Sequence, residues 1–276
     1  MSKTVRCLCM ILAVVMLLAS LAACSGGGGK TVKSPADFAG AKIAVQDETT
    51  ADESIQEMVA GGMKIEVLRY PQVINCFDDL KAGRVDAVYV DSVVAAFYTT
   101  GVADYERVWI SDEDEPLGIC LAKGSVNLRN AIDAAVSMLY FNGKMAEIGK
   151  KHFGNDFAAT RNVTSAPVIP PITNADLRTP GVLSVGADIG YPPMEYYDND
   201  GTTPIGFDID VGKAIAQLLG LEYRVIDTAW DGIFAGVERG DYDCIISSVS
   251  ITPARLQVYL FTDPYIANAL CIVTKK

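Results

Sequence analysis

Short apolar segments alternate with helical segments along most of the chain, and this alternation restricts the fold more than any other feature of the sequence. The apolar segments have the length of strands buried on both faces, and the helices can connect one parallel strand to the next. We expect strands at 42–46, 64–69, 85–90, 117–122, 182–187, 223–226 and 243–247. We expect helices at 50–60, from Pro71, from Ser92, at 127–151 with a break near Asn142, at 207–219 and at 230–238. The sequence therefore predicts an α/β fold with parallel sheets.

The alternation stops between residues 157 and 180. This stretch contains Pro167, Pro170, Pro171 and Pro180, with Thr, Asn and Ser between them. Such a composition is typical of a linker. The segments on either side, 34–156 and 181–276, each suit a small lobe.

The first 23 residues have the features of an export signal. Lys3 and Arg6 give a positive start, and an apolar run follows up to residue 23. The string LAAC at 21–24 resembles the lipobox of bacterial lipoproteins, which implies that Cys24 becomes lipidated. We then expect a flexible tether at 24–33 and a location at the outer face of the cytoplasmic membrane. The alternative is a signal anchor, although the run is short for a spanning helix.

Charge and cysteine spacing exclude several classes of function. The chain has a net charge of −11 and no basic stripe, so it offers no surface for nucleic-acid phosphates. Outside the signal and Cys24, the cysteines are Cys76, Cys120, Cys244 and Cys271, and they lack metal-ligand spacing. The last three lie in apolar runs and are expected in the core, although a Cys244–Cys271 disulfide stays open. We predict no metal and no cofactor.

Several ordered motifs in residues 181–276 resemble one protein family. They are GADIGYPPME (186–195), GFDID (206–210), WDG (230–232), GDYD (240–243), SSVSITPAR (247–255) and FTDPY (261–265). Together they resemble the opening lobe of bacterial type II periplasmic (extracellular) solute-binding proteins of family 3, which bind polar amino acids. Several motifs in order are more specific than one short motif.

The earlier half resembles the rest of the same family. The strings are ADFAGAKIAV (36–45), LKAGRVDAVYVD (80–91) and GKMAEIGKKHFG (143–154). The resemblance implies a circularly permuted, bilobal periplasmic-binding-protein-like α/β fold with a hinge. Lobe B would comprise 34–116, and lobe A would comprise 117–156 and 181–276, with 157–180 as the linker. We expect one crossing between the lobes, near Glu115–Leu117, and chain ends at the hinge. The alternatives are two unrelated partial domains, or lobes exchanged with a second copy.

The resemblance implies a grip on the α-carboxylate and α-ammonium groups of an amino acid. Arg255 would bind the carboxylate as a bidentate fork, with help from backbone N–H groups near Ser250 and Thr252 and from Thr49 and Thr50. Asp91 and the Ser248 carbonyl would accept from the ammonium. From the residues alone, Thr50 could instead cap a helix in a capping box with Glu53, and Asp91 could cap the helix that begins at Ser92.

The resemblance also places residues around the ligand side chain. Tyr191 and Trp230 would sandwich it, although ordinary core packing is the alternative for both rings. Asp188 would reach its far end, and Glu48 adds another acid, unless it points to solvent. These acids favour a basic or neutral polar amino acid over an acidic one.

The family resemblance predicts a function without catalysis. The two lobes would close on an amino acid and deliver it to the permease of an ABC importer. Two alternatives are a dehydratase-like enzyme on the same fold and a ligand sensor that acts through a partner protein. For an enzyme, the serines at 247, 248 and 250 lack a histidine partner, since the one histidine, His152, is expected at the surface.

Overall fold

The protein is built from two five-stranded sheets, each packed against helices on both faces. The computed structural model describes residues 29–154, 157 and 159–276, so the predicted signal peptide, Cys24 and the first part of the tether lie outside the described residues. Residues Thr31–Lys276 form one compact unit. Within the described ranges, no helix has the length and apolarity needed to cross a bilayer.

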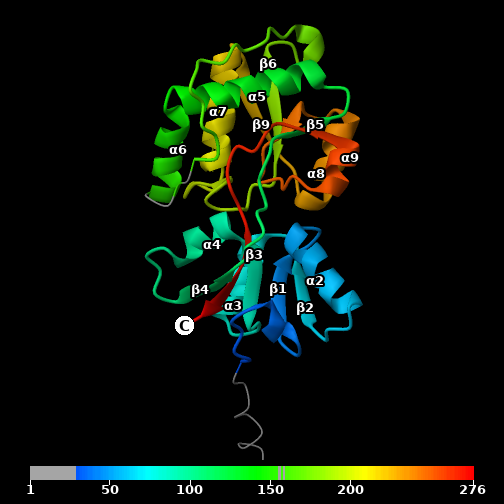
Figure 1. Ribbon diagram of the computed structural model, residues 1–276, viewed down its shortest axis with the longest axis vertical. Helices are drawn as coiled ribbons and strands as arrows, with labels where there is room; N and C mark the ends of the chain where they lie inside the picture. Colours follow the sequence, from blue (N-terminus) through cyan, green and yellow to red (C-terminus); the bar gives the residue numbers. More distant parts are fainter. Residues whose placement is uncertain (1–28, 155–156, 158) are drawn as a thin grey trace, which may run out of the picture. The chain divides into compact units, whose positions relative to one another are not determined.

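Lobe B contains the sheet with strand order β2-β1-β3-β12-β4 (Figure 1). β1 pairs in parallel with β2 and β3, whereas β12 is antiparallel to both β3 and β4. The elements of lobe B are η1 (Pro35–Phe38), β1 (Lys42–Gln46), α2 (Thr50–Ala60), β2 (Glu66–Tyr70), α3 (Val73–Lys81), β3 (Ala87–Asp91), α4 (Ser92–Thr99), β4 (Tyr105–Ile110) and β12 (Leu270–Lys275).

The central strands of lobe B are apolar on both faces because helices cover both sides of the sheet. Successive residues of a strand point to opposite faces. Val88 therefore packs in a cluster with Phe77 of α3, while the next residue, Tyr89, packs in a second cluster with Ile55 of α2. This arrangement explains why the strands read as continuous apolar runs.

Lobe A contains the sheet with strand order β11-β5-β10-β6-β9. β6 is parallel to β9 and β10, and β5 is antiparallel to β10 and β11. The elements of lobe A are β5 (Cys120–Ala122), α5 (Val126–Phe141), α6 (Lys144–Phe153), η3 (Asn174–Asp176), β6 (Val182–Ala187), β7 (Tyr196–Tyr197), β8 (Pro204–Ile205), α7 (Phe207–Leu219), β9 (Glu222–Asp227), α8 (Trp230–Arg239), β10 (Cys244–Ile245), α9 (Pro253–Val258) and β11 (Tyr259–Phe261).

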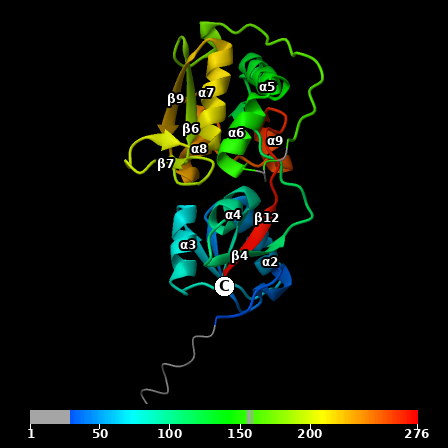
Figure 2. The same ribbon diagram turned by 90° about the vertical axis from the view of Figure 1, so that its left-hand side faces the viewer.

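Helices α5, α6 and α7 lie together beside the lobe A sheet (Figure 2). Buried side chains of β6 face them, including Leu183 and Val185. On the other face, Ile233 and Val237 of α8 pack with Ile245 of β10. The predicted bounds of β1, α2, β6 and α7 are confirmed, and the predicted break between α5 and α6 falls at Asn142 and Gly143. Pro71 does not open a helix, because α3 begins at Val73 after Gln72.

The last strand corrects the predicted assignment of 181–276 to lobe A alone. β12 lies between β3 and β4 in the lobe B sheet, where it is hydrogen-bonded on both sides. Its residues 271–274 are buried, so a central position in a sheet suits its apolar sequence. Because Lys275 pairs with Tyr105, the chain ends inside lobe B, not at the hinge. Val32, near the first described residue, packs in the same cluster as Ile272.

Two segments connect the lobes, so the prediction of a single crossing is wrong. The first leads from β4 to β5 and the second from β11 to β12. They run antiparallel and adjacent: the amide of Glu115 donates to the carbonyl of Asn268 at 2.8 Å, and Leu117 bridges to Ile266. A pair of adjacent strands is the arrangement on which two lobes can hinge.

The described part of the proline-rich segment is attached to lobe A. The guanidinium of Arg161 donates to the carbonyl of Pro264 at 2.8 Å and to Asp133 Oδ1 at 3.0 Å. The ring of Phe157 packs between Gly149 and Phe207. The linker prediction therefore describes the composition correctly but misses these anchoring contacts.

Candidate functional site

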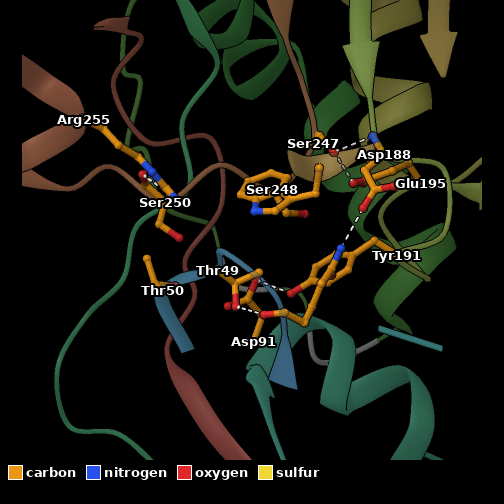
Figure 3. Close-up of a pocket in the computed structure, with 12 residues that line it drawn as sticks. Thr49, Thr50, Asp91, Asp188, Tyr191, Glu195, Ser247, Ser248, Ser250 and Arg255 are labelled. Atoms are coloured by element: carbon orange, nitrogen blue, oxygen red, sulfur yellow. Dashed lines mark hydrogen bonds between the residues drawn. The ribbon is translucent and has the colours of Figure 1, made fainter. Parts of the chain in front are cut away.

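A polar cavity lies where the two lobes meet. Lobe B contributes Gln46, Thr49, Thr50 and Asp91, and the remaining lining residues come from lobe A. Gln46 and Asp91 are the last residues of β1 and β3, and Asp188 directly follows β6. The cavity therefore lies at the carboxyl ends of parallel strands, where open α/β sheets bind ligands. Arg255 and Ser250 lie on one side of it, and Asp188, Glu195 and Ser247 lie on the other (Figure 3).

Most of the residues predicted for ligand binding meet in this cavity. Those that line it are Thr49, Thr50, Asp91, Asp188, Tyr191, Trp230, Ser248, Ser250 and Arg255. Thr252 and Glu48 do not line it. The Thr252 hydroxyl accepts from the Arg255 amide at 3.2 Å and caps α9, and Glu48 is exposed and takes part through its backbone carbonyl.

Arg255 supplies the cation of the cavity. Its Nη1 donates to the Ser250 carbonyl at 3.1 Å, and its guanidinium stacks over Trp230 at 5.6 Å and Phe234 at 5.0 Å. Burial lowers the pKa of Arg255 from its ordinary value. No ion pair joins it to a carboxylate of the described residues. The remaining N–H groups are thus suited to an anion that comes from outside the chain.

Thr49, not Thr50, caps helix α2. The Thr49 hydroxyl accepts from the Asp52 amide at 3.4 Å and donates to the Gln46 carbonyl at 2.8 Å. The predicted capping box of Thr50 and Glu53 is therefore wrong, because the N-cap is Thr49, which has the extended backbone that an N-cap requires. Thr50 is the first residue of the helix and lines the cavity.

The side chain of Asp91 does not cap α4, although Asp91 occupies the N-cap position. Its Oδ2 accepts from the hydroxyl of Tyr191 at 2.7 Å, and its Oδ1 accepts from Nδ2 of Asn268 at 2.8 Å. Burial raises the pKa of Asp91, while these two donors lower it. The carboxylate is thus held at the cavity wall by neutral donors, and no ion pair joins it to a cation of the described residues.

Three hydrogen bonds join the lobes across the cavity. Besides the Tyr191–Asp91 bond, Nε2 of Gln46 donates to Asp188 Oδ2 at 2.8 Å, and Nε1 of Trp230 donates to the Glu48 carbonyl at 3.1 Å. Trp230 and Tyr191 also pack in apolar clusters, as the core-packing alternative predicts, and both rings line the cavity.

Three lining residues were not predicted from the sequence: Gln46, Glu195 and Ser247. Together with Asp188 they form one end of the cavity. The Ser247 hydroxyl donates to Glu195 Oε1 at 2.6 Å and accepts from the Asp188 amide at 3.0 Å. Burial raises the pKa of Asp188 to about 6. Burial and the neighbouring Asp208 raise the pKa of Glu195 well above its usual range. Only the GADIGYPPME string could have signalled Glu195.

Glu115 was also missed, because it ends the acidic run Asp112–Glu115, which reads as a solvated loop. In the structure it lies on the first crossing segment, and its Oε2 accepts from Nδ2 of Asn268 at 3.1 Å. Burial and the nearby Asp91 raise the pKa of Glu115 to about 7, against the lowering effect of Thr50, Ser250 and Arg255. The carboxyl group thus lies beside several groups that line the cavity.

Other candidate chemistry lies elsewhere. Among the described residues, no cluster of His, Cys, Asp and Glu could hold a metal ion. Cys76, Cys120, Cys244 and Cys271 are buried and free, and Cys244 and Cys271 belong to different sheets. The His152 side chain is not at the surface as predicted: it is only 7% exposed, and its Nε2 lies 2.8 Å from Asp210 Oδ2, because α6 packs against α7.

The fold and the cavity define a class of protein with two α/β lobes, two adjacent connecting segments, and a polar cavity that sets an arginine opposite carboxylates. Residues 183–276 match the bacterial extracellular solute-binding proteins, family 3. The chain belongs to this family.

Several proteins of known name are similar to part of the chain. The L-cystine-binding protein TcyA of Bacillus subtilis (strain 168) is 35% identical over 102 residues, which are 37% of this chain and 38% of that protein. The ABC transporter arginine-binding protein 1 of Escherichia coli (strain K12) is 32% identical over 94 residues, 34% of this chain and 38% of that protein. The arginine-bound form of domain 1 from TmArgBP is 34% identical, with 35% of this chain and 81% of that chain covered, at a TM-score of 0.31. The chain thus spans well under half the length of the curated relatives that it matches.

Proposed function

We propose that the protein binds an amino acid between its two lobes, without chemical conversion. The observation that carries this proposal is the pairing of opposite charges across the cavity. Arg255 of lobe A has free donor capacity for a carboxylate, and Asp91 of lobe B has no cationic partner in the cavity. An α-amino acid carries both complementary groups, and its contacts to both lobes would shift the protein toward the closed form.

The charge of the cavity favours a polar or basic amino acid. Asp91 and Asp188 outnumber the one cation among the lining residues, Arg255. A ligand carboxylate would neutralise Arg255 and a ligand ammonium would neutralise Asp91. Asp188 then remains for a donor or cation on the ligand side chain. Relatives named for binding arginine and cystine agree with a ligand of this kind.

We propose that the loaded protein delivers its ligand to the permease of an ABC importer, as the names of the relatives suggest. In this proposal, lipid on Cys24 holds the protein at the outer face of the cytoplasmic membrane. Replacement of Cys24 by alanine is expected to move the protein from the detergent phase to the aqueous phase in a detergent partition experiment, and retention in the detergent phase would contradict the anchor.

We also propose that the chain is a circular permutant of its family. The family match covers only 183–276, while the strings that resemble the second lobe precede it. Val32 and Ile272 pack in one cluster, as expected if a connection inside lobe B had been opened. A chain that begins at residue 181, joins residue 276 to residue 31 and ends at residue 154 tests this proposal. It is expected to fold and to bind the same amino acid, and failure to fold would refute the permutation.

A thermal-shift screen of residues 25–276 against the twenty amino acids and L-cystine tests the binding function. A ligand that binds only the native state raises the melting temperature. We expect a rise with a few polar or basic amino acids. No rise with any of them, in protein unfolded and refolded to remove carried ligand, would refute the proposal. Triad chemistry of the cavity serines is disfavoured because His152 is engaged with Asp210, away from the cavity. Turnover of prephenate-like acids would instead support a dehydratase, with Asp188 as an acid or base.

A further inference from the structure

A single amide holds two carboxyl groups beside the cavity. Nδ2 of Asn268 donates to Asp91 Oδ1 at 2.8 Å and to Glu115 Oε2 at 3.1 Å. The amide is oriented by Ser92, whose hydroxyl donates to Asn268 Oδ1 at 3.1 Å. Asn268 is 4% exposed, so this clamp is buried. It joins the end of β3 to both crossing segments.

The two carboxyl groups are also close to each other. Because the same nitrogen donates to one oxygen of each group, Asp91 Oδ1 and Glu115 Oε2 lie on either side of one amide. Two carboxyl groups can share a hydrogen bond only when one of them carries a proton, because two adjacent like charges repel. Repulsion between the two neighbouring carboxylates therefore favours one proton on the pair while the cavity is empty.

The charges that face this pair come from several elements. Arg255 of α9 is the nearby cation, and it attracts both acids without an ion pair to either in the described chain. Glu53 of α2 also lies near Arg255 and attracts its guanidinium group. Tyr191 donates to Asp91 as a neutral phenol.

We propose that Asp91 and Glu115, clamped by Asn268, act as one ammonium-binding unit that holds a shared proton while empty and releases it when the ligand's ammonium group binds. This inference rests on the proposed function and assigns Glu115 as a positioning residue that acts through Asp91. The ammonium brings a positive charge to the place of the proton, so the charge of the pair stays balanced. The proton leaves to the solvent.

The expected size of the effect follows from linkage. Burial and Asp91 raise the pKa of Glu115 to about 7, so at pH 7 about half of the empty molecules carry the shared proton. Binding at pH 7 then releases roughly half a proton per ligand. Because the proton competes with the ligand, the dissociation constant falls by up to about tenfold between pH 6 and pH 8.

Calorimetry with L-arginine as the probe tests the proposal. Binding is measured at pH 7 in phosphate and in Tris, whose ionisation enthalpies differ, so the difference in binding enthalpy gives the number of protons released. The Glu115→Gln variant keeps the shape of the side chain but cannot ionise. Glu113→Gln is the matched control, because Glu113 is an exposed acid two residues earlier on the same segment. Wild type and Glu113→Gln are expected to release a proton fraction, and Glu115→Gln is expected to release none.

A titration of the ligand-free protein separates this proposal from the proposed function. In protein labelled with carbon-13 at the glutamate carboxyl, one resonance is expected to titrate near pH 7 and to disappear in Glu115→Gln. Absence of that resonance would overturn the proposal even if amino acids bind. The proposal would also be overturned if Glu115→Gln bound L-arginine with the same proton release and pH profile as wild type.

Discussion

Replacement of Arg255 by alanine is expected to remove binding of every amino acid, since the α-carboxylate is common to all of them. Removal of one partner of a buried, hydrogen-bonded charge pair costs about 3–5 kcal/mol. This corresponds to an affinity that is lower by a factor of about 10² to 4 × 10³. The variant also loses one hydrogen bond to the Ser250 carbonyl and the stacking on Trp230, so the free energy of unfolding falls by about 1–2 kcal/mol.

Two further variants, one intermediate and one control, test this prediction. Arg255→Lys keeps the positive charge but loses the planar fork, so its affinity is expected to lie between those of wild type and Arg255→Ala. Arg239→Ala removes an exposed arginine of lobe A that pairs with Asp241, and it is expected to bind as wild type. Calorimetry with the amino acid that gives the largest thermal shift measures all three. A dissociation constant for Arg255→Ala within twofold of wild type would refute the assignment of the carboxylate site.

Three more predictions follow from the structure. Asp188→Asn is expected to weaken binding of amino acids with a cationic side chain by about tenfold while neutral ones bind as before, since a hydrogen bond to a charged group contributes about 1.5 kcal/mol; calorimetry with arginine and glutamine checks this, and an equal loss for both would contradict it. Burial raises the pKa values of Asp188 and Asp208 to about 6, above their unfolded values, so the folded state binds protons more tightly. The free protein is therefore expected to melt at a higher temperature at pH 5.5 than at pH 7.5 in a calorimetric scan, and the reverse order would refute these shifts. Asp243→Ala leaves the amides of Arg178 and Ser184 without their acceptor and is expected to lower the free energy of unfolding by about 2–4 kcal/mol in urea titration, whereas a loss below 0.5 kcal/mol would contradict this role.

The elements that sequence reasoning places well are those whose own residues fix their ends. Helix α7 begins after Gly206 and ends at Gly220, which has the left-handed backbone that stops a helix. β6 is bounded by Gly181 and by the polar residue Asp188. Helix α2 has the predicted bounds although the capping residue was misplaced by one position. In each case the residues that set the ends lie in or next to the element, so the sequence alone predicts its bounds.

The elements that sequence reasoning misplaces depend on distant partners. Arg161 is held by the carbonyls of Asp263 and Pro264 and by Asp133, none of which is near it in the sequence. A proline-rich composition therefore indicates the absence of regular structure without indicating mobility. The same reason explains Glu115: its acidic neighbours suggest solvent, whereas Asn268, far along the chain, holds it beside the cavity.

The position of β12 shows why the cavity draws on both ends of the chain. This strand must lie between β3 and β4 to satisfy its backbone hydrogen bonds on both sides, so the second crossing segment is pulled alongside the first. That pairing brings Asn268 to Asp91 and Glu115, and it sets Arg255 across the cavity from Asp91. The lobe-to-lobe connection and the charged site are thus built by the same strand. A variant that weakens the pairing of β12 is therefore expected to impair ligand binding even when both lobes keep their own cores.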